Sequence, residues 1–394
     1  MSLHMKRTAL IAAIVLIVSS CGVSYNKTQH FDDEHFAELQ KIMDNKPTPK
    51  NARYVYTEAS ELNLIGKILD NTSNPYHRVD TVKYKGFTKG ENLQVRCSAG
   101  LAVLFKTNSS SITVKTVWGD KHTESYSMPL TLAGYDLYIR NENGEWIWAK
   151  NAYGDPTKDE KVVTLISNMA PGTKECLLYL PIYNEILSCQ IGVEEGSVLE
   201  ALESPFRHRI AFHGSSYTHG ISTSRSGMSY PMQFMRSTGF QVLGLGCSGN
   251  CRLQPYFADV MADVEADAYV FDTFSNPDWK TIKKRLIPFI DRLVEAHPGK
   301  PLIFQQTIYR ESRTYNTYTN AFEQAKQDMA SSMFDEILKN PKYKDVYFIR
   351  PDASVKGSHE YQVDGTHPDD HGYYMWAKSI EKPILRILKK YGIK

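Results

Sequence analysis

The chain has 394 residues, which is too many for one ordinary hydrophobic core, so we expect two domains. Hydrophobic residues make up 42% and charged residues 23%, proportions that are typical of a globular protein. The net charge of +2 and the lack of a basic run argue against nucleic acid as the main partner.

Residues 1–21 are predicted to be a lipoprotein signal peptide. Lys6 and Arg7 form a basic stretch, and the apolar stretch Ala9 to Val18 is too short to span a bilayer. It is followed by Ser-Ser-Cys, which resembles a bacterial lipobox ending at Cys21. An ordinary secretory signal with an incidental cysteine is the alternative. We therefore expect an exported bacterial lipoprotein, anchored through lipid on Cys21 in the periplasm or at the cell surface.

Residues 22–52 are predicted to be a linker that contains one short helix. Three acidic residues, Asp32 to Glu34, open a helical pattern that runs to Met43, and acids are favoured at a helix N-terminus. Pro47 and Pro49 then indicate an irregular connection.

Residues 53–203 carry short strand patterns separated by turn residues. Asn143-Gly144 lies between two of them and is a hairpin signal. The series predicts an antiparallel β-sandwich domain. Strands are expected at Leu93–Cys97, Ser111–Val117, Tyr135–Ile139, Glu145–Ala149, Val162–Ile166 and Glu175–Leu180.

Residues 204–394 alternate between strand and helix patterns. This alternation predicts a parallel sheet covered by helices on both faces, with functional residues at the carboxyl ends of the strands. Strands are expected at Arg209–His213, Gln241–Leu245, Ala268–Phe274, Leu302–Gln306 and Val346–Ile349. Helices are expected at about Gly227–Ser237, Trp279–Ala296 and Asn316–Leu338.

The cysteine pattern leaves two interpretations open. Export permits disulfides, and Cys247 and Cys251 are close enough in sequence to pair across a loop. They could equally be small buried hydrophobic residues. No CxxC pair is present, so we predict no structural metal site.

A candidate nucleophile and its base stand far apart in the sequence. Asp364 precedes His367 by three residues on a tight loop, where a carboxylate can orient an imidazole during proton transfer. Ser216 follows the first strand of the second domain, next to Gly214, where a sharp turn and a helix start are expected. The alternative is that Ser215 and Ser216 only cap that helix.

Two further strand ends carry candidate oxyanion donors. The second strand is followed by a G-x-G-x-x-G pattern ending at Gly249. A dinucleotide site is disfavoured because the pattern follows the second strand rather than the first and Pro255 interrupts the continuation, so we predict no cofactor. Asn276 follows the third strand and could present its amide to the same oxygen, or could be a helix N-cap or a turn residue before Pro277.

In order and placement, these Ser, Gly, Asn, Asp and His residues resemble the SGNH hydrolases, also called GDSL-type esterases. Gly134–Tyr138 resembles the Gly-x-Asp-Leu-Tyr motif of a bacterial branch with a preceding β-domain. Gly246–Cys251 and Ser224–Gly227 match two further motifs of that branch. Ser215 replaces the Asp of the wider family, whose third block also has a Gly and an Asp that are missing around Asn276.

The resemblance implies a C-terminal flavodoxin-like three-layer α/β/α hydrolase domain with a parallel sheet after the β-sandwich. It implies a catalytic Ser216, His367 and Asp364 and an oxyanion hole of Ser216, Gly249 and Asn276. We expect an esterase that removes acyl groups, most simply acetyl, from a glycan or another small ester.

Two rival functions and the oligomeric state stay open at this point. A non-catalytic glycan-binding lipoprotein on the same scaffold is one alternative. A metal site formed by Asp364, His367, Asp369, Asp370 and His371 is the other, and Pro368 disfavours it because it prevents a helix there.

Overall fold

The computed structural model describes residues 32–123, 125, 127–158, 160–352 and 358–394, which belong to two units. In the first unit, helix α2 (Asp33–Asp44) begins after Asp32, whose carboxylate accepts a hydrogen bond from the His35 N–H. The predicted signal peptide and Cys21 lie outside the described residues. Within those residues, no helix is long and apolar enough to cross a membrane.

The second unit, residues 47–394, begins with two antiparallel sheets, as predicted. The smaller sheet has the order β1 (Tyr54–Glu58), β9 (Ile186–Glu194), β4 (Ile112–Trp118) and β7 (Glu160–Ile166). The larger sheet has the order β10 (Leu199–Ala201), β3 (Ala102–Thr107), β8 (Lys174–Tyr179), β5 (Gly134–Arg140) and β6 (Trp146–Tyr153), and β2 (Asn63–Ile65) pairs with β3. Strands β5 and β6 form the hairpin predicted at Asn143-Gly144.

The larger sheet is buried on both of its faces. Val103 and Phe105 of β3 pack into the core between the two antiparallel sheets. Ala102 and Leu104 of the same strand belong instead to a core that continues into the C-terminal domain. Since alternate residues of a strand point to opposite faces, this sheet forms the middle layer between the smaller sheet and the hydrolase-like half.

One predicted strand is wrong. Leu93–Cys97 is expected to be a strand, but residues Lys89–Val95 form helix α3. The Thr88 hydroxyl accepts from the Glu91 N–H, and the Glu91 carboxylate accepts from the Thr88 N–H, which is a capping box. Gln94 is buried although it is polar. The alternation of apolar and polar residues in this segment therefore does not correspond to one buried and one exposed face of a strand. The β-domain also contains α4 (Pro129–Ala133) and a short 3-10 helix at Ala59–Glu61.

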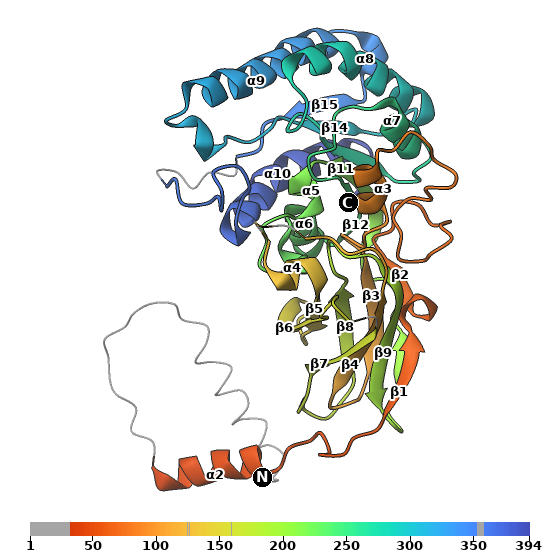
Figure 1. Cartoon of the computed structure of the whole chain (residues 1–394), viewed down its shortest axis with the longest axis vertical. Helices are drawn as coiled ribbons and strands as arrows, with labels where there is room; N and C mark the ends of the chain where they lie inside the picture. The colour runs from red at the N-terminus through yellow and green to blue at the C-terminus, as the bar shows by residue number, and fades with distance from the viewer. Residues whose placement is uncertain (1–31, 124, 126, 159, 353–357) are drawn as a thin grey trace. The chain divides into compact units, whose positions relative to one another are not determined.

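The C-terminal half contains a five-stranded parallel sheet, which confirms the predicted fold class (Figure 1). Its order is β12 (Phe240–Gly246), β11 (Arg207–Gly214), β13 (Ala268–Asp272), β14 (Leu302–Gln305) and β15 (Val346–Ile349). In sequence order this is 2-1-3-4-5, the flavodoxin-like arrangement.

Helices cover both faces of the parallel sheet (Figure 1). One face packs against α6 (Tyr230–Thr238) and α10 (Asp370–Lys390). The other packs against α7 (Pro255–Ala262), α8 (Trp279–Ala296) and α9 (Thr317–Ile337). Short helical turns are α5 (Ser216–His219), η2 (Ser226–Met228), η3 (Glu311–Arg313) and η4 (Pro341–Tyr343).

Cys247 and Cys251 are buried free thiols. Of the two interpretations left open by the sequence, the structure therefore shows small buried side chains rather than a disulfide. Burial raises the pKa of the Cys247 thiol to about 12, so this thiol stays protonated at neutral pH.

Two motifs noted in the sequence bind one another across the boundary between the halves. The carboxylate of Asp136, in the Gly-x-Asp-Leu-Tyr motif, is fully buried. It accepts hydrogen bonds from the Arg225 guanidinium at 2.8 Å, the Gly227 N–H at 2.9 Å and the Trp148 indole at 2.9 Å. Arg225 also donates to the Tyr138 hydroxyl. The two motifs thus form one buried ionic contact between the β-domain and the C-terminal half.

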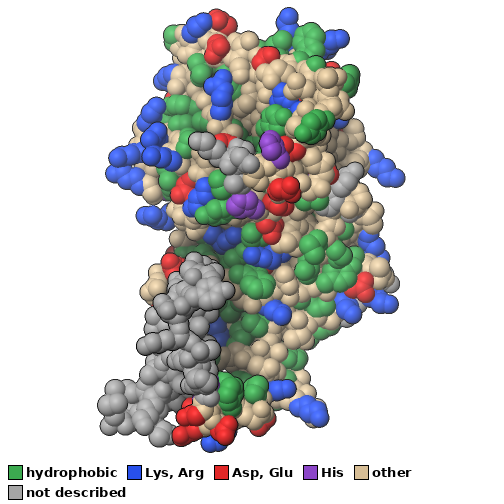
Figure 2. Space-filling view, turned by 90° about the vertical axis from the view of Figure 1, so that its left-hand side faces the viewer, with side chains coloured by type: hydrophobic (Ala, Val, Ile, Leu, Met, Phe, Trp, Pro, Cys, Tyr) green, Lys and Arg blue, Asp and Glu red, His purple; other side chains and the backbone are tan. Residues whose placement is uncertain are grey.

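The charged surface is mixed. On the face shown in Figure 2, acidic and basic side chains of the described residues are interspersed, and neither sign gathers into one large area. This distribution agrees with the net charge of +2.

Candidate active site

Ser216 stands at the carboxyl end of β11, where the strand turns sharply into α5. A side chain at Gly214 would bring its Cβ to 2.1 Å from the Thr218 hydroxyl and 2.8 Å from the Asp272 Cβ, so this turn requires glycine. Ser215 caps α5 by accepting from the Tyr217 N–H. The neighbouring Ser216 hydroxyl is therefore left to face the cleft, with 4% of the residue exposed.

His367 and Asp364 complete a hydrogen-bonded series with Ser216. The Ser216 Oγ lies 3.0 Å from His367 Nε2, and His367 Nδ1 lies 2.8 Å from Asp364 Oδ2. Asp364 Oδ1 also accepts from the backbone N–H groups of Thr366 and His367. Burial alone would raise the pKa of Asp364, but the hydrogen bonds from His367 outweigh burial and lower the pKa to about 2. Asp364 is consequently an anion at any ordinary pH.

A partly buried arginine, Arg310, supports the loop that carries His367. The Arg310 Nε donates to the Tyr217 hydroxyl at 2.9 Å, and that hydroxyl donates to the Thr366 carbonyl at 2.9 Å. The Tyr217 ring also lies edge-on to the imidazole, with 5.6 Å between ring centroids. These contacts hold the residue before His367 in place from below the cleft.

Gly249 is oriented by a residue of the β-domain that the sequence analysis did not single out. Gly249 has φ +69°, in the left-handed region that favours glycine. The preceding carbonyl, of Ser248, accepts from the Gln94 side chain at 3.0 Å and from the Asn250 side chain at 2.8 Å. Because a trans peptide points its C=O and N–H in opposite directions, fixing this carbonyl also fixes the direction of the Gly249 N–H.

Asn276 is held in one orientation by the neighbouring loop. Its Oδ1 accepts the Cys251 N–H at 3.1 Å, which leaves the amide nitrogen as the end that can serve the cleft. The N-cap of α8 is Asp278, so Asn276 is not the helix cap that the sequence left open.

The predicted site residues meet in one cleft of about 370 Å³. Ser216, Gly249, Asn276 and His367 all line it, and Asp364 lies behind His367. The cleft walls are completed by Ile221, Ser248, Arg252, Ser275, Arg310, Phe322, Lys326 and Thr366.

A buried carboxylate, Asp272, anchors the turn that carries Ser216, and no sequence pattern indicated this role. Its Oδ2 accepts from the Ser215 hydroxyl at 2.7 Å, the Ser215 N–H at 3.2 Å and the Thr218 hydroxyl at 3.2 Å. Its Oδ1 accepts from the Ser275 hydroxyl at 2.9 Å. Ser215, which replaces the family's Asp, is therefore tied to a carboxylate at the end of the adjacent strand.

This carboxylate predicts a pH-dependent contribution to stability. Burial raises the pKa of Asp272 from 3.8 to about 6, so between these values the folded chain holds a proton that the unfolded chain has lost. The contribution of Asp272 to the free energy of unfolding should thus fall as pH rises from about 4 to 6, by on the order of 3 kcal/mol. Urea unfolding of wild type and Asp272→Asn at pH 4 and 6.5 measures this. A wild-type-minus-variant difference that does not change with pH would contradict it.

The acidic residues beside His367 have structural partners. Asp369 caps α10 by accepting the Gly372 N–H at 2.8 Å, and Asp370 accepts the Ser224 N–H at 2.8 Å. Both lie at the start of α10. Over the described part of the chain, no three His, Cys, Asp or Glu side chains are grouped so as to hold a metal ion.

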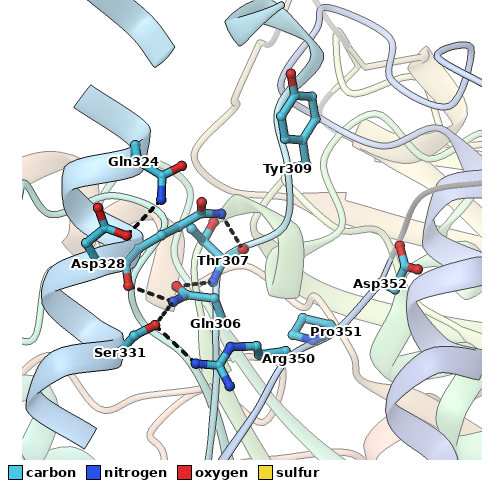
Figure 3. A pocket seen from close by; sticks show the side chains of 10 residues that line it. Gln306, Thr307, Tyr309, Gln324, Asp328, Ser331, Arg350, Pro351 and Asp352 are labelled. Carbon is cyan, nitrogen blue, oxygen red and sulfur yellow. Dashed lines mark hydrogen bonds between the residues drawn. The ribbon is translucent and has the colours of Figure 1, made fainter. Parts of the chain in front are cut away.

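A second cleft of about 330 Å³ lies beyond the carboxyl ends of β14 and β15 (Figure 3). Its glutamine amide groups are hydrogen-bonded to neighbouring residues. The Gln306 amide donates to the Gln327 carbonyl and the Ser331 hydroxyl, and Gln324 donates to Asp328. The Ser331 hydroxyl accepts hydrogen bonds from Gln306 and Arg350. The Ser216 hydroxyl, in contrast, is hydrogen-bonded to a histidine. The arrangement for nucleophilic chemistry is in the first cleft.

A flavodoxin-like sheet with Ser, Gly, Asn and His at its carboxyl edge is the arrangement of an SGNH-type hydrolase. A family model described as the GDSL-like lipase/acylhydrolase family matches residues 207–386. A second, GxDLY, described as the N-terminus of SGNH-hydrolase-type esterases, matches residues 53–199. The chain belongs to this GDSL-like lipase/acylhydrolase family, since it is also 36% identical to a GDSL-like lipase from Bacteroides ovatus, with a TM-score of 0.81, over 86% of this chain and 98% of that one.

More distant structures share the fold. A salicylyl-acyltransferase from a tetracycline biosynthetic pathway is 18% identical over 88% of this chain and all of its own, with a TM-score of 0.67. A family two carbohydrate esterase from Cellvibrio japonicus is 12% identical over 86% of this chain and 99% of its own, with a TM-score of 0.56. A comparison with curated proteins found no match.

Proposed function

We propose that this hydrolase is an exported serine esterase that removes acetyl groups from a carbohydrate. The observation that carries the proposal is the series Ser216 Oγ, His367 Nε2, His367 Nδ1 and Asp364 Oδ2, joined at 3.0 and 2.8 Å at the edge of an open cleft. Such a series activates a hydroxyl for attack on an ester carbonyl.

The proposed reaction has two acyl-transfer steps. His367 accepts the proton of Ser216 as its Oγ attacks the ester carbonyl, and then donates that proton to the departing sugar hydroxyl. Water next attacks the acetyl-serine with His367 again as base, which releases acetate and restores Ser216. Asp364 stays ionised throughout and stabilises the imidazolium.

The oxyanion of each tetrahedral intermediate would be held by the N–H groups of Ser216 and Gly249 and the amide of Asn276. Asn276→Ala should lower kcat by about 10²–10³, because it removes one such donor. It should also cost about 1–3 kcal/mol of stability, because the Cys251 N–H loses its acceptor. Steady-state kinetics on p-nitrophenyl acetate measures the change in kcat. A loss of less than threefold would remove Asn276 from the oxyanion hole.

The lining of the cleft supports a short acyl group. Only Ile221 and Phe322 among its described residues have large apolar side chains, and a long acyl chain needs a continuous apolar wall. We therefore expect kcat/KM to be at least about tenfold higher for p-nitrophenyl acetate than for p-nitrophenyl octanoate, because little apolar area is available for the longer chain. The reverse preference would indicate a lipase.

Exposed aromatic rings beside the cleft support a carbohydrate substrate. Phe322 is 37% exposed and lies nearly parallel to Tyr318, which is 77% exposed, with 6.3 Å between their ring centroids. Exposed aromatic faces at a cleft offer apolar surface of the kind on which sugar rings stack. The fold shared with a carbohydrate esterase from Cellvibrio japonicus is in line with this substrate class.

We further propose that the protein is anchored to a membrane through lipid on Cys21. The basic and apolar N-terminal stretch and its Ser-Ser-Cys ending support this location. An extracellular or periplasmic site would give the enzyme access to polymeric glycans. Radiolabelled palmitate should label the protein expressed in a bacterial host, and Cys21→Ser should remove both the label and membrane fractionation.

A further inference from the structure

Three basic side chains line the catalytic cleft. Arg252, Arg310 and Lys326 line it together with Ser216 and His367. Among the described lining residues, no carboxylate faces these three cations from within the cleft. This composition differs from that of the molecule as a whole, in which acids and bases nearly balance.

Within the described residues, Glu323 is the one carboxylate that forms ion pairs with these cations. Glu323 accepts from Arg310 Nη1 at 2.8 Å and from Lys326 Nζ at 2.7 Å, so one carboxylate is shared by two cations. The Arg252 Nε donates to the neutral backbone carbonyl of Gly249 at 3.2 Å. Three cations beside Ser216 therefore share a single ion-paired carboxylate. The carboxylates of Asp272 and Asp364 lie behind the cleft and are hydrogen-bonded to other residues.

Arg310, which is partly buried, and Lys326, which is buried, each retain N–H groups that are not used in these contacts. Arg310 gives three of its five N–H groups to Tyr217, Glu323 and Ser275. Lys326 gives two of its three to Glu323 and Ser275. Within the described residues, this leaves two guanidinium N–H groups and one ammonium N–H for a bound molecule. Burial and the charge of Arg310 lower the pKa of Lys326 to about 8, as expected where positive charge is incompletely neutralised.

We propose that the ester substrate carries a negatively charged group close to the acyl group, which the cluster of Arg252, Arg310 and Lys326 binds. A neutral sugar would have to displace water from three cations with no ionic compensation, whereas a carboxylate, sulfate or phosphate accepts charge-assisted hydrogen bonds from them. The proposal rests on the esterase function above and narrows the substrate to an acetylated acidic sugar.

The cluster lies next to the aromatic rings. Lys326 Nζ is 5.1 Å from the centre of the Phe322 ring. Neighbouring side chains would therefore bind the acidic group and the sugar ring of the substrate. An acidic sugar could thus stack on Phe322 while its anion meets Lys326 and Arg252.

The test compares substrates that differ only in charge. Acetate release is measured from methyl glucuronoside acetates and from the same acetates with the carboxylate converted to its neutral methyl ester. Methyl glucoside acetates that carry a 6-sulfate or a 6-phosphate distinguish the kind of anion. The charged esters should show kcat/KM about 10–100-fold higher than the neutral ones, and added salt should reduce only the charged values.

Variants locate the effect. Arg252→Gln removes an exposed cation, and Lys326→Met removes a buried cation while keeping a side chain of similar length. Each substitution should reduce the ratio of kcat/KM for the charged ester to kcat/KM for the neutral ester by about tenfold. Lys283→Gln, an exposed lysine of α8 outside the cleft lining, should leave the ratio unchanged. Arg252→Gln remains informative if Lys326→Met does not fold, because Arg252 is exposed.

The outcomes separate this inference from the esterase proposal. If Ser216-dependent release of acetate is detected from none of the esters, p-nitrophenyl acetate included, both proposals are overturned. Hydrolysis of p-nitrophenyl acetate with charged sugar esters cleaved no faster than neutral ones overturns this inference alone. A ratio that Arg252→Gln leaves unchanged removes Arg252 from the binding cluster, and one that both variants leave unchanged overturns the assignment.

Discussion

Ser216→Ala will lower kcat on p-nitrophenyl acetate by on the order of 10⁶-fold while the chain still folds. The hydroxyl is the only atom removed, and its hydrogen bond to His367 is the contact that would activate it. Little stability should be lost, because the turn is held by Ser215 and Asp272 rather than by the Ser216 side chain. Initial rates and circular dichroism on the same preparations measure the two effects.

Ser332→Ala is the matched control for this result. Ser332 is an exposed residue of α9 on the opposite side of the sheet from α10, and it should retain full activity. Residual activity of Ser216→Ala above about one per cent of wild type would show that another group attacks the ester. The assignment of His367 and Asp364 would then lose its basis, because both act through this serine.

Asp136→Ala will destabilise the protein by about 3–5 kcal/mol, because it leaves the Arg225 guanidinium in a buried contact without its carboxylate. The Gly227 N–H and the Trp148 indole lose their acceptor as well. Equilibrium unfolding in urea measures the change. We also expect lower activity, because Asp136 fixes the segment whose Ser224 is bonded to Asp370 at the start of α10.

An exposed ion pair of the same chemistry is the control for Asp136. Arg292 donates to Asp259 at 2.9 Å, and both side chains are about half exposed. Asp259→Ala should cost less than about 1 kcal/mol, since an exposed pair gains little over water. If the two variants lose the same free energy of unfolding, the Asp136 contact between the β-domain and the hydrolase domain stabilises the protein no more than a surface ion pair does.

The sequence predicted that the three upstream candidates would converge, because each of them follows a strand. Strands β11, β12 and β13 are marked by apolar runs, and the carboxyl ends of parallel strands meet at one edge of the sheet. Ser216, Gly249 and Asn276 could therefore be expected to converge before any coordinate was known. The Asp364–His367 pair was visible because its partners are three residues apart.

Residues that act across the domain boundary were not predictable in the same way. Gln94 lies in a short apolar-polar alternation that indicated a strand, although Thr88 and Glu91 carried the signature of a capping box. Its contact with Ser248 joins positions 154 residues apart. The gathering of Arg252, Arg310 and Lys326 is equally non-local, since they come from three different loops and helices.

Labelling of Ser216 by a fluorophosphonate tests the account most directly. A fluorophosphonate reacts with an activated serine, so mass spectrometry of the wild type should show one added phosphonyl group, on the peptide that contains Ser216, and a parallel loss of esterase activity. Ser216→Ala should take up no label. Labelling of a different residue, or full activity after Ser216 is labelled, would contradict the claim that Ser216 is the nucleophile.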